Sequence, residues 1–264
     1  MARFCPLFSG SSGNSYYFGS AESGILIDAG RSAKQLTAAL GNCGLDMKAV
    51  RGIFITHEHS DHICGLRVLA SRHHIPVYAA PGTLKALEEM NCLTDRYTAS
   101  PIPSKGMECA GMYITSFHTS HDSAESVGFR IDIGNGRSAA VATDLGFMSD
   151  EVRSGVAGVD LLVLESNHDE AMLRSGPYPY PLKKRILSQR GHLSNTACAD
   201  ELVRFAASGT TRFWLAHLSH ENNTPDLAYE TSHCGLMMAG LQEGLDYKLN
   251  VAPRENETGR FIVF

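Results

Sequence analysis

The stretch from Thr56 to His62, with the sequence THEHSDH, limits most strongly what this chain can fold into. It follows the apolar run 52–55, which predicts a β-strand that ends in the polar stretch. His57 and His59 point to the same side wherever the chain stays extended, because side chains alternate along a strand. After a tight turn, Asp61 and His62 can face a second position nearby. Four potential ligands in six positions argue against a polar loop that is rich in histidine by chance.

We therefore predict a site for two divalent metal ions. Neutral imidazole and carboxylate groups are ligands that suit Zn, Mn or Fe. Zn and Mn both remain open here, because the same nitrogen and oxygen ligands serve either ion and availability often decides between them.

The composition predicts one ordinary globular domain that spans residues 1–264. Hydrophobic residues make up 43% of the chain and charged residues 19%, as in ordinary globular proteins. No apolar run approaches the roughly 18 residues that a membrane span needs, and the apolar segment within residues 1–8 is too short for a signal peptide. The seven cysteines form no CxxC pair, which is typical of small buried side chains in a reducing cytoplasm. We expect a cytoplasmic protein with no membrane partner, and its oligomeric state stays open.

The net charge of −5 argues against a broad surface for polyanions. It does not exclude nucleic acid as a partner, because two divalent ions can supply positive charge where a phosphate must sit. A nucleic-acid path would have to be local. The compact basic groups are 183–185 with Arg190, and Arg72 with His73 and His74, and each can equally be a solvated helix or loop face.

Short apolar runs alternate with helical patterns, which predicts sheet layers covered by helices on their outer faces. Strands are predicted at 15–18, 24–28, 52–56, 77–79, 112–117, 127–133, 138–142, 161–164, 213–216, 247–251 and 261–264. Helices are predicted at 32–40, 64–72, 83–90, 150–156, 181–188, 195–207 and 225–238. Thr224 followed by Pro225 favours a helix start, and Gly209 favours a helix end. The segment 175–181 has three prolines at alternate positions and predicts an ordered surface loop.

Further candidate ligands also follow apolar runs. His118 and His121 come after the run 113–117, Asp144 after 138–143, and His217 after 213–216. A lone histidine in such a place is more often structural, but several strand ends that carry ligands to one sheet edge are what a two-metal pocket requires. Asp144 as a bridging carboxylate would hold the ions about 3.5–4 Å apart. Of His118 and His121 we favour His121, because the stretch from it into the next strand forms a single motif.

These motifs resemble a known family. The HxHxDH core, together with Asp144 and His217, resembles the metallo-β-lactamase fold. More of the chain, from Ser9 to Asn223, is similar to the bacterial YycJ/WalJ group of that superfamily. The supporting stretches are LIDAG at 26–30, THEHSDH at 56–62, HDS at 121–123, TDLG at 143–146, ESNHD at 165–169, GHLSN at 191–195 and HLSHENN at 217–223.

The resemblance implies a four-layer αββα sandwich of the α+β class, with two divalent ions at its edge. It implies that one ion is held by His57, His59 and His121. The other would be held by Asp61, His62 and His217, with Asp144 shared between the two. Members of the group are thought to be nucleases, including 5′-to-3′ exonucleases that act on duplex DNA.

A phosphodiesterase of this kind needs a base near the attacking water and an acid for the leaving oxygen. Asp61 can orient the water or take its proton. His192 is the candidate acid, because related nucleases have a His-x-Ser/Thr motif upstream of the last metal-binding histidine that contacts the scissile phosphate. Ser194 would cap a helix that begins with Asn195 and would also contact the phosphate, and Asn195 is a further candidate for a substrate contact. The alternative is that Ser194 only caps the helix and His192 only packs.

Three further positions are candidates near the substrate. Glu165 follows the apolar run 160–164 and is predicted to orient His192 or a metal ligand. His168 could line the substrate path. Asn14 lies in the Gly/Ser run 9–15, whose backbone N–H groups could approach a phosphate, although such runs are more often plain turns.

The leading hypothesis is a metal-dependent hydrolase that acts as a 5′-to-3′ exonuclease on double-stranded DNA. The chain has no long insertion like that of the β-CASP nucleases and no obvious exosite arm like that of the transfer-RNA processing enzymes, so the substrate is less constrained. One alternative is a small-molecule hydrolase of the same fold that acts on a cyclic phosphodiester, thioester or lactone. Another is a metal-binding protein without catalytic activity.

Overall fold

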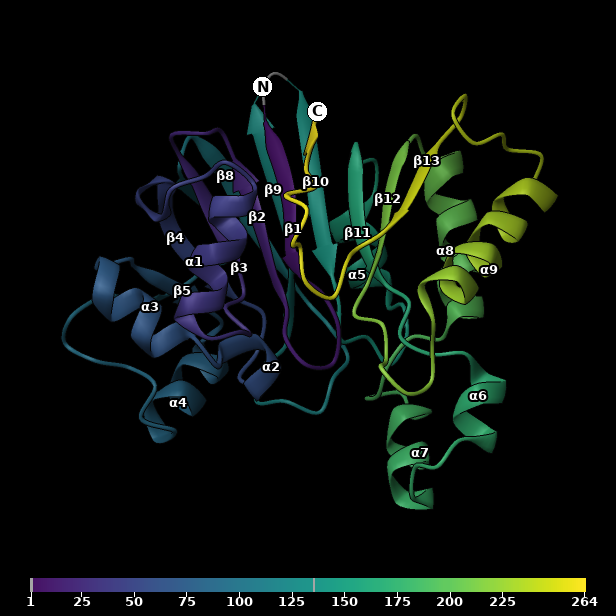
Figure 1. Ribbon diagram of the computed structural model, residues 1–264, viewed down its shortest axis with the longest axis horizontal. Coiled ribbons are helices and arrows are strands. Elements are labelled where there is room, and N and C mark those ends of the chain that lie inside the picture. Colours follow the sequence, from purple (N-terminus) through teal and green to yellow (C-terminus); the bar gives the residue numbers. More distant parts are fainter. Residues whose placement is uncertain (1, 135) are drawn as a thin grey trace.

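Two β-sheets lie face to face in the computed structural model, which describes residues 2–134 and 136–264. Helices cover the outer face of each sheet (Figure 1). Over the described residues the strand order is β14-β1-β2-β3-β4-β5-β6 in one sheet and β13-β12-β11-β10-β9-β8-β7 in the other. The predicted four-layer αββα sandwich is confirmed.

The first sheet contains most of the amino-terminal part of the chain. Its strands are β1 Arg3–Phe8, β2 Ser15–Gly19, β3 Gly24–Ile27, β4 Val50–Ile55, β5 Val77–Ala79, β6 Ala99–Pro101 and β14 Ile262–Val263. The helices on this side are α1 Ala33–Asn42, η1 Met47–Ala49, α2 Ser60–Ile63, α3 Leu66–His73 and α4 Pro81–Glu89. Leu26 and Ile53 on the outer face share a buried cluster with Leu36 of α1 and Leu69 of α3.

The second sheet contains the later strands. They are β7 Met107–Cys109, β8 Met112–His118, β9 Val127–Gly134, β10 Arg137–Ala142, β11 Leu161–Glu165, β12 Arg212–Ala216 and β13 Lys248–Val251. The helices after them are α5 Asp150–Val156, α6 Glu170–Ser175, α7 Tyr180–Ile186, α8 Asn195–Ala207 and α9 Pro225–Met238. The helices α5, α8 and α9 cover this sheet, whereas α6 and α7 extend beyond its lower edge in Figure 1.

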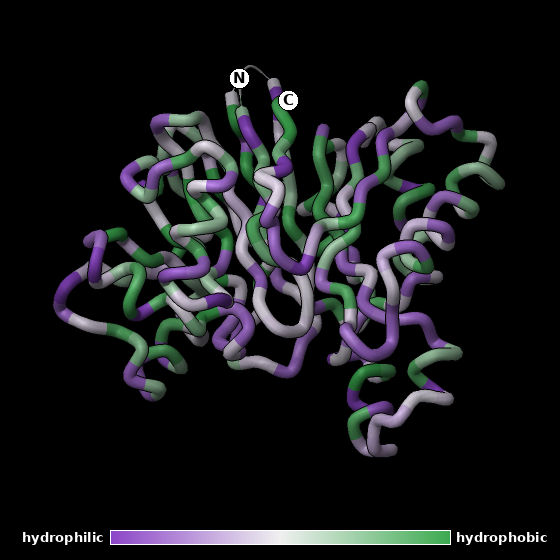
Figure 2. Tube along the Cα trace, in the orientation of Figure 1, coloured by the Kyte–Doolittle hydropathy of each residue, from purple (hydrophilic) through white to green (hydrophobic). Residues whose placement is uncertain are grey.

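A third buried cluster fills the space between the sheets. Strand β11 shows how this is built: Leu161 and Val163 face the other sheet, while Leu162 and Leu164 pack under the helices. The strand is therefore apolar at consecutive positions, as expected for one that is covered on both faces. Figure 2 shows the hydrophobic residues concentrated along the central strands.

Several elements differ from the sequence-based expectation. Strand β1 was not predicted, because it contains Pro6; the pairing register with β2 shifts between Pro6 and Phe8, where a bulge accommodates a residue that lacks an N–H. The three-residue strands β6 and β7 and the short helix α6 were also missed. The predicted loop 175–181 extends too far along the chain, because α7 already begins at Tyr180. Helix α7 tolerates Pro181 in its first turn, where a backbone N–H would have no partner within the helix.

Both predicted helix boundaries are confirmed. The Thr224 side chain accepts a hydrogen bond from the N–H of Leu227 at 3.1 Å and so caps α9. Helix α8 ends at Ala207, two residues before Gly209, which has a φ of +103°. In the described part of the chain, no helix is both long and apolar enough to span a membrane.

Candidate metal centre

Five strand ends meet at one edge of the sandwich. Strand β3 runs parallel to β4, and β10 runs parallel to β11 and β12 in turn. Because parallel strands end at the same edge of a sheet, the polar residues at or just after their last residues are brought together. These residues are Asp28, His57, Asp144, Glu165 and His217.

Three of these residues adopt an uncommon backbone conformation. Asp28, Asp144 and His217 have φ values of 63°, 59° and 55°, in the left-handed region that side chains other than glycine seldom occupy. Such positions cost roughly 1–3 kcal/mol each and are retained where the surrounding structure requires them, often at functional sites. All three lie at the edge where the polar side chains gather.

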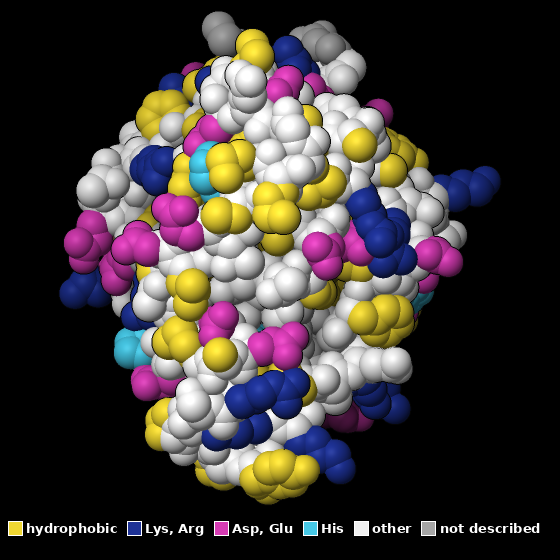
Figure 3. Space-filling view, turned by 90° about the vertical axis from the view of Figure 1, so that its right-hand side faces the viewer, with side chains coloured by type: hydrophobic (Ala, Val, Ile, Leu, Met, Phe, Trp, Pro, Cys, Tyr) yellow, Lys and Arg dark blue, Asp and Glu magenta, His cyan; other side chains and the backbone are white. Residues whose placement is uncertain are grey.

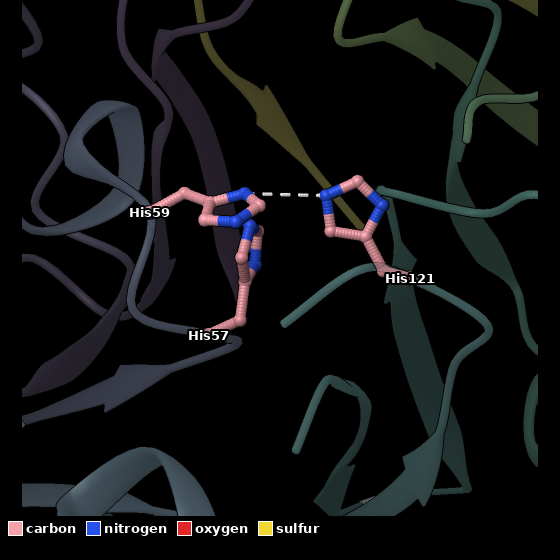
Figure 4. Close-up of side chains that lie close together, drawn as sticks. All are labelled: His57, His59 and His121. Atoms are coloured by element: carbon pink, nitrogen blue, oxygen red, sulfur yellow. Dashed lines mark hydrogen bonds between the residues drawn. The ribbon is translucent and has the colours of Figure 1, made fainter. Parts of the chain in front are cut away.

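His57, His59 and His121 form the first cluster (Figure 4). Their nearest ring nitrogens lie within 4.8 Å of one another. His57 and His59 come from the segment after β4, and His121 approaches them from the segment after β8, with its Nε2 atom 3.2 Å from Nδ1 of His59. The Nε2 atom of His57 is buried and has no hydrogen-bond partner among the described residues. A buried nitrogen left free beside two others suits a metal ligand.

Asp61, His62 and His217 form the second cluster, also within 4.8 Å. Oδ2 of Asp61 lies 3.4 Å from Nε2 of His62 and 3.3 Å from Nε2 of His217. Asp144 lies between the two clusters. Its Oδ1 atom is 3.6 Å from Nε2 of both His121 and His217, and its Oδ2 atom is 3.3 Å from Nε2 of His62. The carboxylate thus reaches residues of both clusters.

Three of these histidines, His62, His121 and His217, are held from behind through Nδ1. The Nδ1 atom of His62 lies 2.7 Å from Oδ2 of Asp28, and that of His217 lies 2.9 Å from Oε1 of Glu165. The Nδ1 atom of His121 likewise lies 3.1 Å from the carbonyl oxygen of Gly191. Each ring therefore turns Nε2 toward the cluster, an arrangement found around metal-binding histidines. Asp28 is not among the candidates predicted from the sequence, although it follows an apolar strand just as Asp144 does.

His192 lies beside both clusters. Its ring centroid is 5.1 Å from that of His121 and 5.2 Å from that of His217, and its Nδ1 atom lies 2.8 Å from Oε1 of Glu165. The other oxygen of Glu165 accepts the N–H of Leu193 at 3.1 Å. Burial would raise the pKa of Glu165, but the charge of His192 and the hydrogen bonds from His192 and His217 lower it to about 2. Glu165 is thus an ionised, buried acceptor that orients two imidazoles.

The electrostatic field of the site favours cations. Burial alone would lower the pKa of His217, yet Asp144, Asp61 and Glu165 raise it to about 10. Burial would also lower the pKa of His62, but the charges of Asp144, Asp28 and Asp61 raise it well above its usual value. Buried carboxylates need compensating positive charge, and metal ions bound by the neutral imidazoles would supply it. The donor set and the unpartnered nitrogen of His57 therefore fit divalent metal ions.

The remaining predicted positions fall into different surroundings. The side chain of His118 is 62% exposed and contacts Glu151 at 2.9 Å and Glu125 at 3.3 Å, so it lies outside the clusters that include His121. The Nδ2 atom of Asn14 lies 3.3 Å from Oδ2 of Asp61 and 3.2 Å from Nε2 of His62.

Three further predicted positions are buried, as Asn14 is. Ser194 caps α8, with its Oγ atom accepting the N–H of Ala197 at 3.3 Å. Asn195 is 1% exposed and accepts a hydrogen bond from Ser166. His168 is also 1% exposed, and burial lowers its pKa to about 4. The predicted substrate contacts of Asn14, Asn195 and His168 would thus require these buried side chains to become accessible.

Comparison with known proteins places the chain in a family. Residues 24–218 match the family model of the β-lactamase superfamily domain. The chain belongs to this superfamily. Superfamily relatives include the exodeoxyribonuclease YycJ of Bacillus anthracis, 40% identical over 231 residues that make up 86% of each chain. The exodeoxyribonuclease WalJ of Streptococcus pneumoniae is 37% identical over 250 residues, or 94% of this chain and 93% of that protein.

The fold is that of the metallo-β-lactamases. The structure of Zn²⁺-bound PqqB from Methylobacterium extorquens matches 100% of both chains with a TM-score of 0.75, at 16% sequence identity. Together with the histidine and aspartate clusters, membership of this superfamily makes the chain a metal-dependent hydrolase.

Proposed function

We propose that the chain is a dinuclear metal-dependent phosphodiesterase that degrades double-stranded DNA as a 5′-to-3′ exonuclease. The observation that carries this proposal is the position of His192, held by Glu165 beside both histidine clusters. When a phosphodiester is hydrolysed, the leaving group is an alkoxide, and a positioned acid that protonates it helps it to depart. A thiolate leaving group does not need such an acid. The proposal that DNA is the substrate is supported by the names of the relatives YycJ and WalJ, and its polarity by the resemblance to their group.

Under this proposal each cluster holds one ion. His57, His59 and His121 would bind one, and Asp61, His62 and His217 the other. Asp144 would contribute to both sites, because its two oxygens face residues of both clusters. Bound divalent ions would provide an activated water near neutral pH and would neutralise charge on the phosphoryl oxygens.

The side chains would divide the proton transfers between them. Asp61, whose pKa is held low by His62 and His217 against the effect of burial, would orient the attacking water or accept its proton. The Nδ1–H group of His192 would donate a hydrogen bond to ionised Glu165, and a proton carried on Nε2 would pass to the leaving oxygen. Ser194 and Asn14 would contact the phosphate, with Asn14 already beside Asp61.

The first test is cleavage of a 5′-labelled DNA duplex by the wild type, in parallel with Mn²⁺ and Zn²⁺, with Asp61→Ala as the inactive control. Release of the terminal labelled nucleotide first would support the exonuclease and its polarity. Internal cuts or release from the 3′ end would contradict the polarity. No cleavage with either metal, at confirmed metal content, would instead favour a small cyclic phosphodiester, thioester or lactone.

The role of His192 has a separate test. His192→Ala should keep its bound metal and lose turnover by roughly 10²–10⁴, as expected for a general acid. His220→Ala is the matched control, because the His220 side chain is 65% exposed and pairs with Glu221. Normal turnover of a folded, metal-loaded His192→Ala protein would contradict the role of His192.

A further inference from the structure

We infer that the helix pair α6–α7 forms a docking arm that binds the DNA strand leading into the metal centre. The arm comprises residues 170–190, which include α6, α7 and the segment that follows α7. This inference rests on the proposed nuclease function and adds to it a surface for the substrate outside the histidine clusters. In Figure 1 the arm extends below the sheets on the same side as α2, which carries Asp61 and His62.

Hydrogen bonds attach the arm directly to the metal centre. The carbonyl oxygen of Ile186, the last residue of α7, accepts the N–H of His192 at 3.0 Å. The guanidinium of Arg190 donates to the carbonyl oxygen of His121 at 3.2 Å. Arg185 binds the carboxylate of Asp122, the neighbour of His121, with its terminal nitrogen at 2.8 Å. The position of α7 is therefore set by the residues that flank the clusters.

The arm is the most basic part of an acidic chain. Residues 170–190 contain five basic residues and one acidic residue, Glu170, although the net charge of the chain is −5. Figure 3 shows Lys and Arg side chains gathered at the lower end of the molecule, where α6 and α7 lie in Figure 1. The hydrogen bonds that Arg185 donates to Asp122 raise the pKa of Arg185, and the charges of Asp122, Asp144 and Asp61 add to this, which places the guanidinium within the field of the metal centre. Positive charge arranged along such a path suits a phosphate backbone.

Two side chains of the arm are free to meet a ligand. Lys184 is exposed and Tyr180 is 77% exposed, and neither forms a hydrogen bond or ion pair with another described residue. Both line a surface hollow of about 550 Å³ together with Arg174, Lys183 and Leu187. Lys183 has a structural role instead, because its ammonium donates to the carbonyl oxygens of Arg174 and Gly176 at 2.7 Å.

The combination of an exposed aromatic ring with free positive charge is typical of surfaces for single strands, where bases stack on rings and cations follow the backbone. Helix α7 has seven residues. Its length of roughly 10 Å corresponds to about three nucleotides at the rise of a stacked strand. A strand whose terminal phosphate lies at the metal centre would therefore pass along α7 and place unpaired bases near Tyr180.

The test compares surface variants of the metal-loaded protein. Lys184→Ala and Tyr180→Ala probe the arm. Lys248→Ala is the matched charge control, because Lys248 is exposed at the start of β13, on the edge opposite the site. Tyr180→Phe keeps the ring and controls for the loss of stacking. Binding is measured by fluorescence anisotropy of a labelled duplex with a short single-stranded 5′ end, at several salt concentrations. Hydrolysis of bis(p-nitrophenyl) phosphate, a diester too small to reach the arm, reports the metal centre.

We expect Tyr180→Ala to weaken binding by about tenfold and Tyr180→Phe to bind as the wild type does. Lys184→Ala should reduce the slope of log K against log salt by about 0.7–0.9, and Lys248→Ala should not. All four variants should hydrolyse the small diester at the wild-type rate.

Wild-type binding by both arm variants would overturn the inference, as would a wild-type protein that does not bind the duplex. A parallel loss on the small diester would also overturn it, because the variants would then act through the metal centre. Binding that depends on the arm, in a protein that does not cleave the duplex, would support the arm and reject the proposed nuclease function.

Discussion

The Nδ1 atom of His192 lies 2.8 Å from Oε1 of Glu165, a carboxylate with no exposed surface. The same oxygen lies 2.9 Å from Nδ1 of His217, a residue of the second cluster. One buried acid thus orients both a proposed metal ligand and the proposed acid. A change at Glu165 should therefore affect metal binding and proton transfer together.

The substitution Glu165→Gln tests this coupling. In either orientation the amide of glutamine sets its NH₂ group against other N–H donors, because Oε1 of Glu165 faces both Nδ1 atoms and Oε2 accepts the N–H groups of Leu145 and Leu193. We therefore expect a loss of roughly 10–100-fold in metal affinity or turnover. The plot of log kcat against pH should also change shape, because the buried negative charge beside the proposed acid is removed. Metal titration and a pH profile measure the two effects. Glu170→Gln on the surface of α6 is the control, and a pH profile of wild-type shape would contradict the coupling.

Asp28 is expected to act through His62 in the same way. Asp28→Asn is the informative change, because asparagine tolerates the left-handed backbone at φ 63° that alanine would strain. The lost charge should weaken binding of the second ion by roughly 10–100-fold while the fold is retained. Isothermal titration with Zn²⁺ or Mn²⁺ measures the affinity. Unchanged affinity at both sites would show that the Asp28 charge is not needed to hold His62.

Metal removal should destabilise the folded state. Ions that bind only the folded chain stabilise it by about 2.7 kcal/mol when free metal is 100 times Kd, which corresponds to roughly 5–10 °C in Tm for a chain of this size. Thermal unfolding with and without a chelator measures this shift. His121→Ala should reduce the shift, whereas His118→Ala should retain it because His118 lies outside the clusters. Equal shifts in both variants would argue against His121 as a ligand.

His118 should make stability depend weakly on pH. Its pKa is raised by hydrogen bonds to Glu151 of α5 and Glu125 of the loop before β9, against the effect of partial burial. A folded-state pKa above the unfolded value means that the stabilisation is present below about pH 6.5 and is lost as pH rises through the folded-state value. Because the side chain is largely exposed, the effect should stay below about 1 kcal/mol.

Urea unfolding of the wild type and His118→Ala, at pH values on both sides of that range, measures the pH-dependent part. We expect the two proteins to differ most at low pH and least at high pH. A difference that grows with pH would reverse the expected sign and contradict the ion pairs.

The sequence by itself determined the fold class and most positions in the site. The histidine-rich stretch after a strand, Asp144 and His217 after two later strands, and the motif around His192 were each visible because strand periodicity and residue type are local properties. Strand β1 was not visible, because Pro6 contradicts a strand until a bulge is known to accommodate it. Local pattern also left His118 and His121 as alternatives, since both follow the same strand.

Only the tertiary structure decided which side chains meet. The pairing of Asp28 with His62, the shared contacts of Glu165 and the attachment of α7 to Asp122 join segments that are 34 to 63 positions apart. Such contacts depend on strand order and on the packing of the two sheets, which involve the whole chain at once. Residue type can therefore predict a metal ligand, but the group that holds the ligand in place is determined by long-range packing.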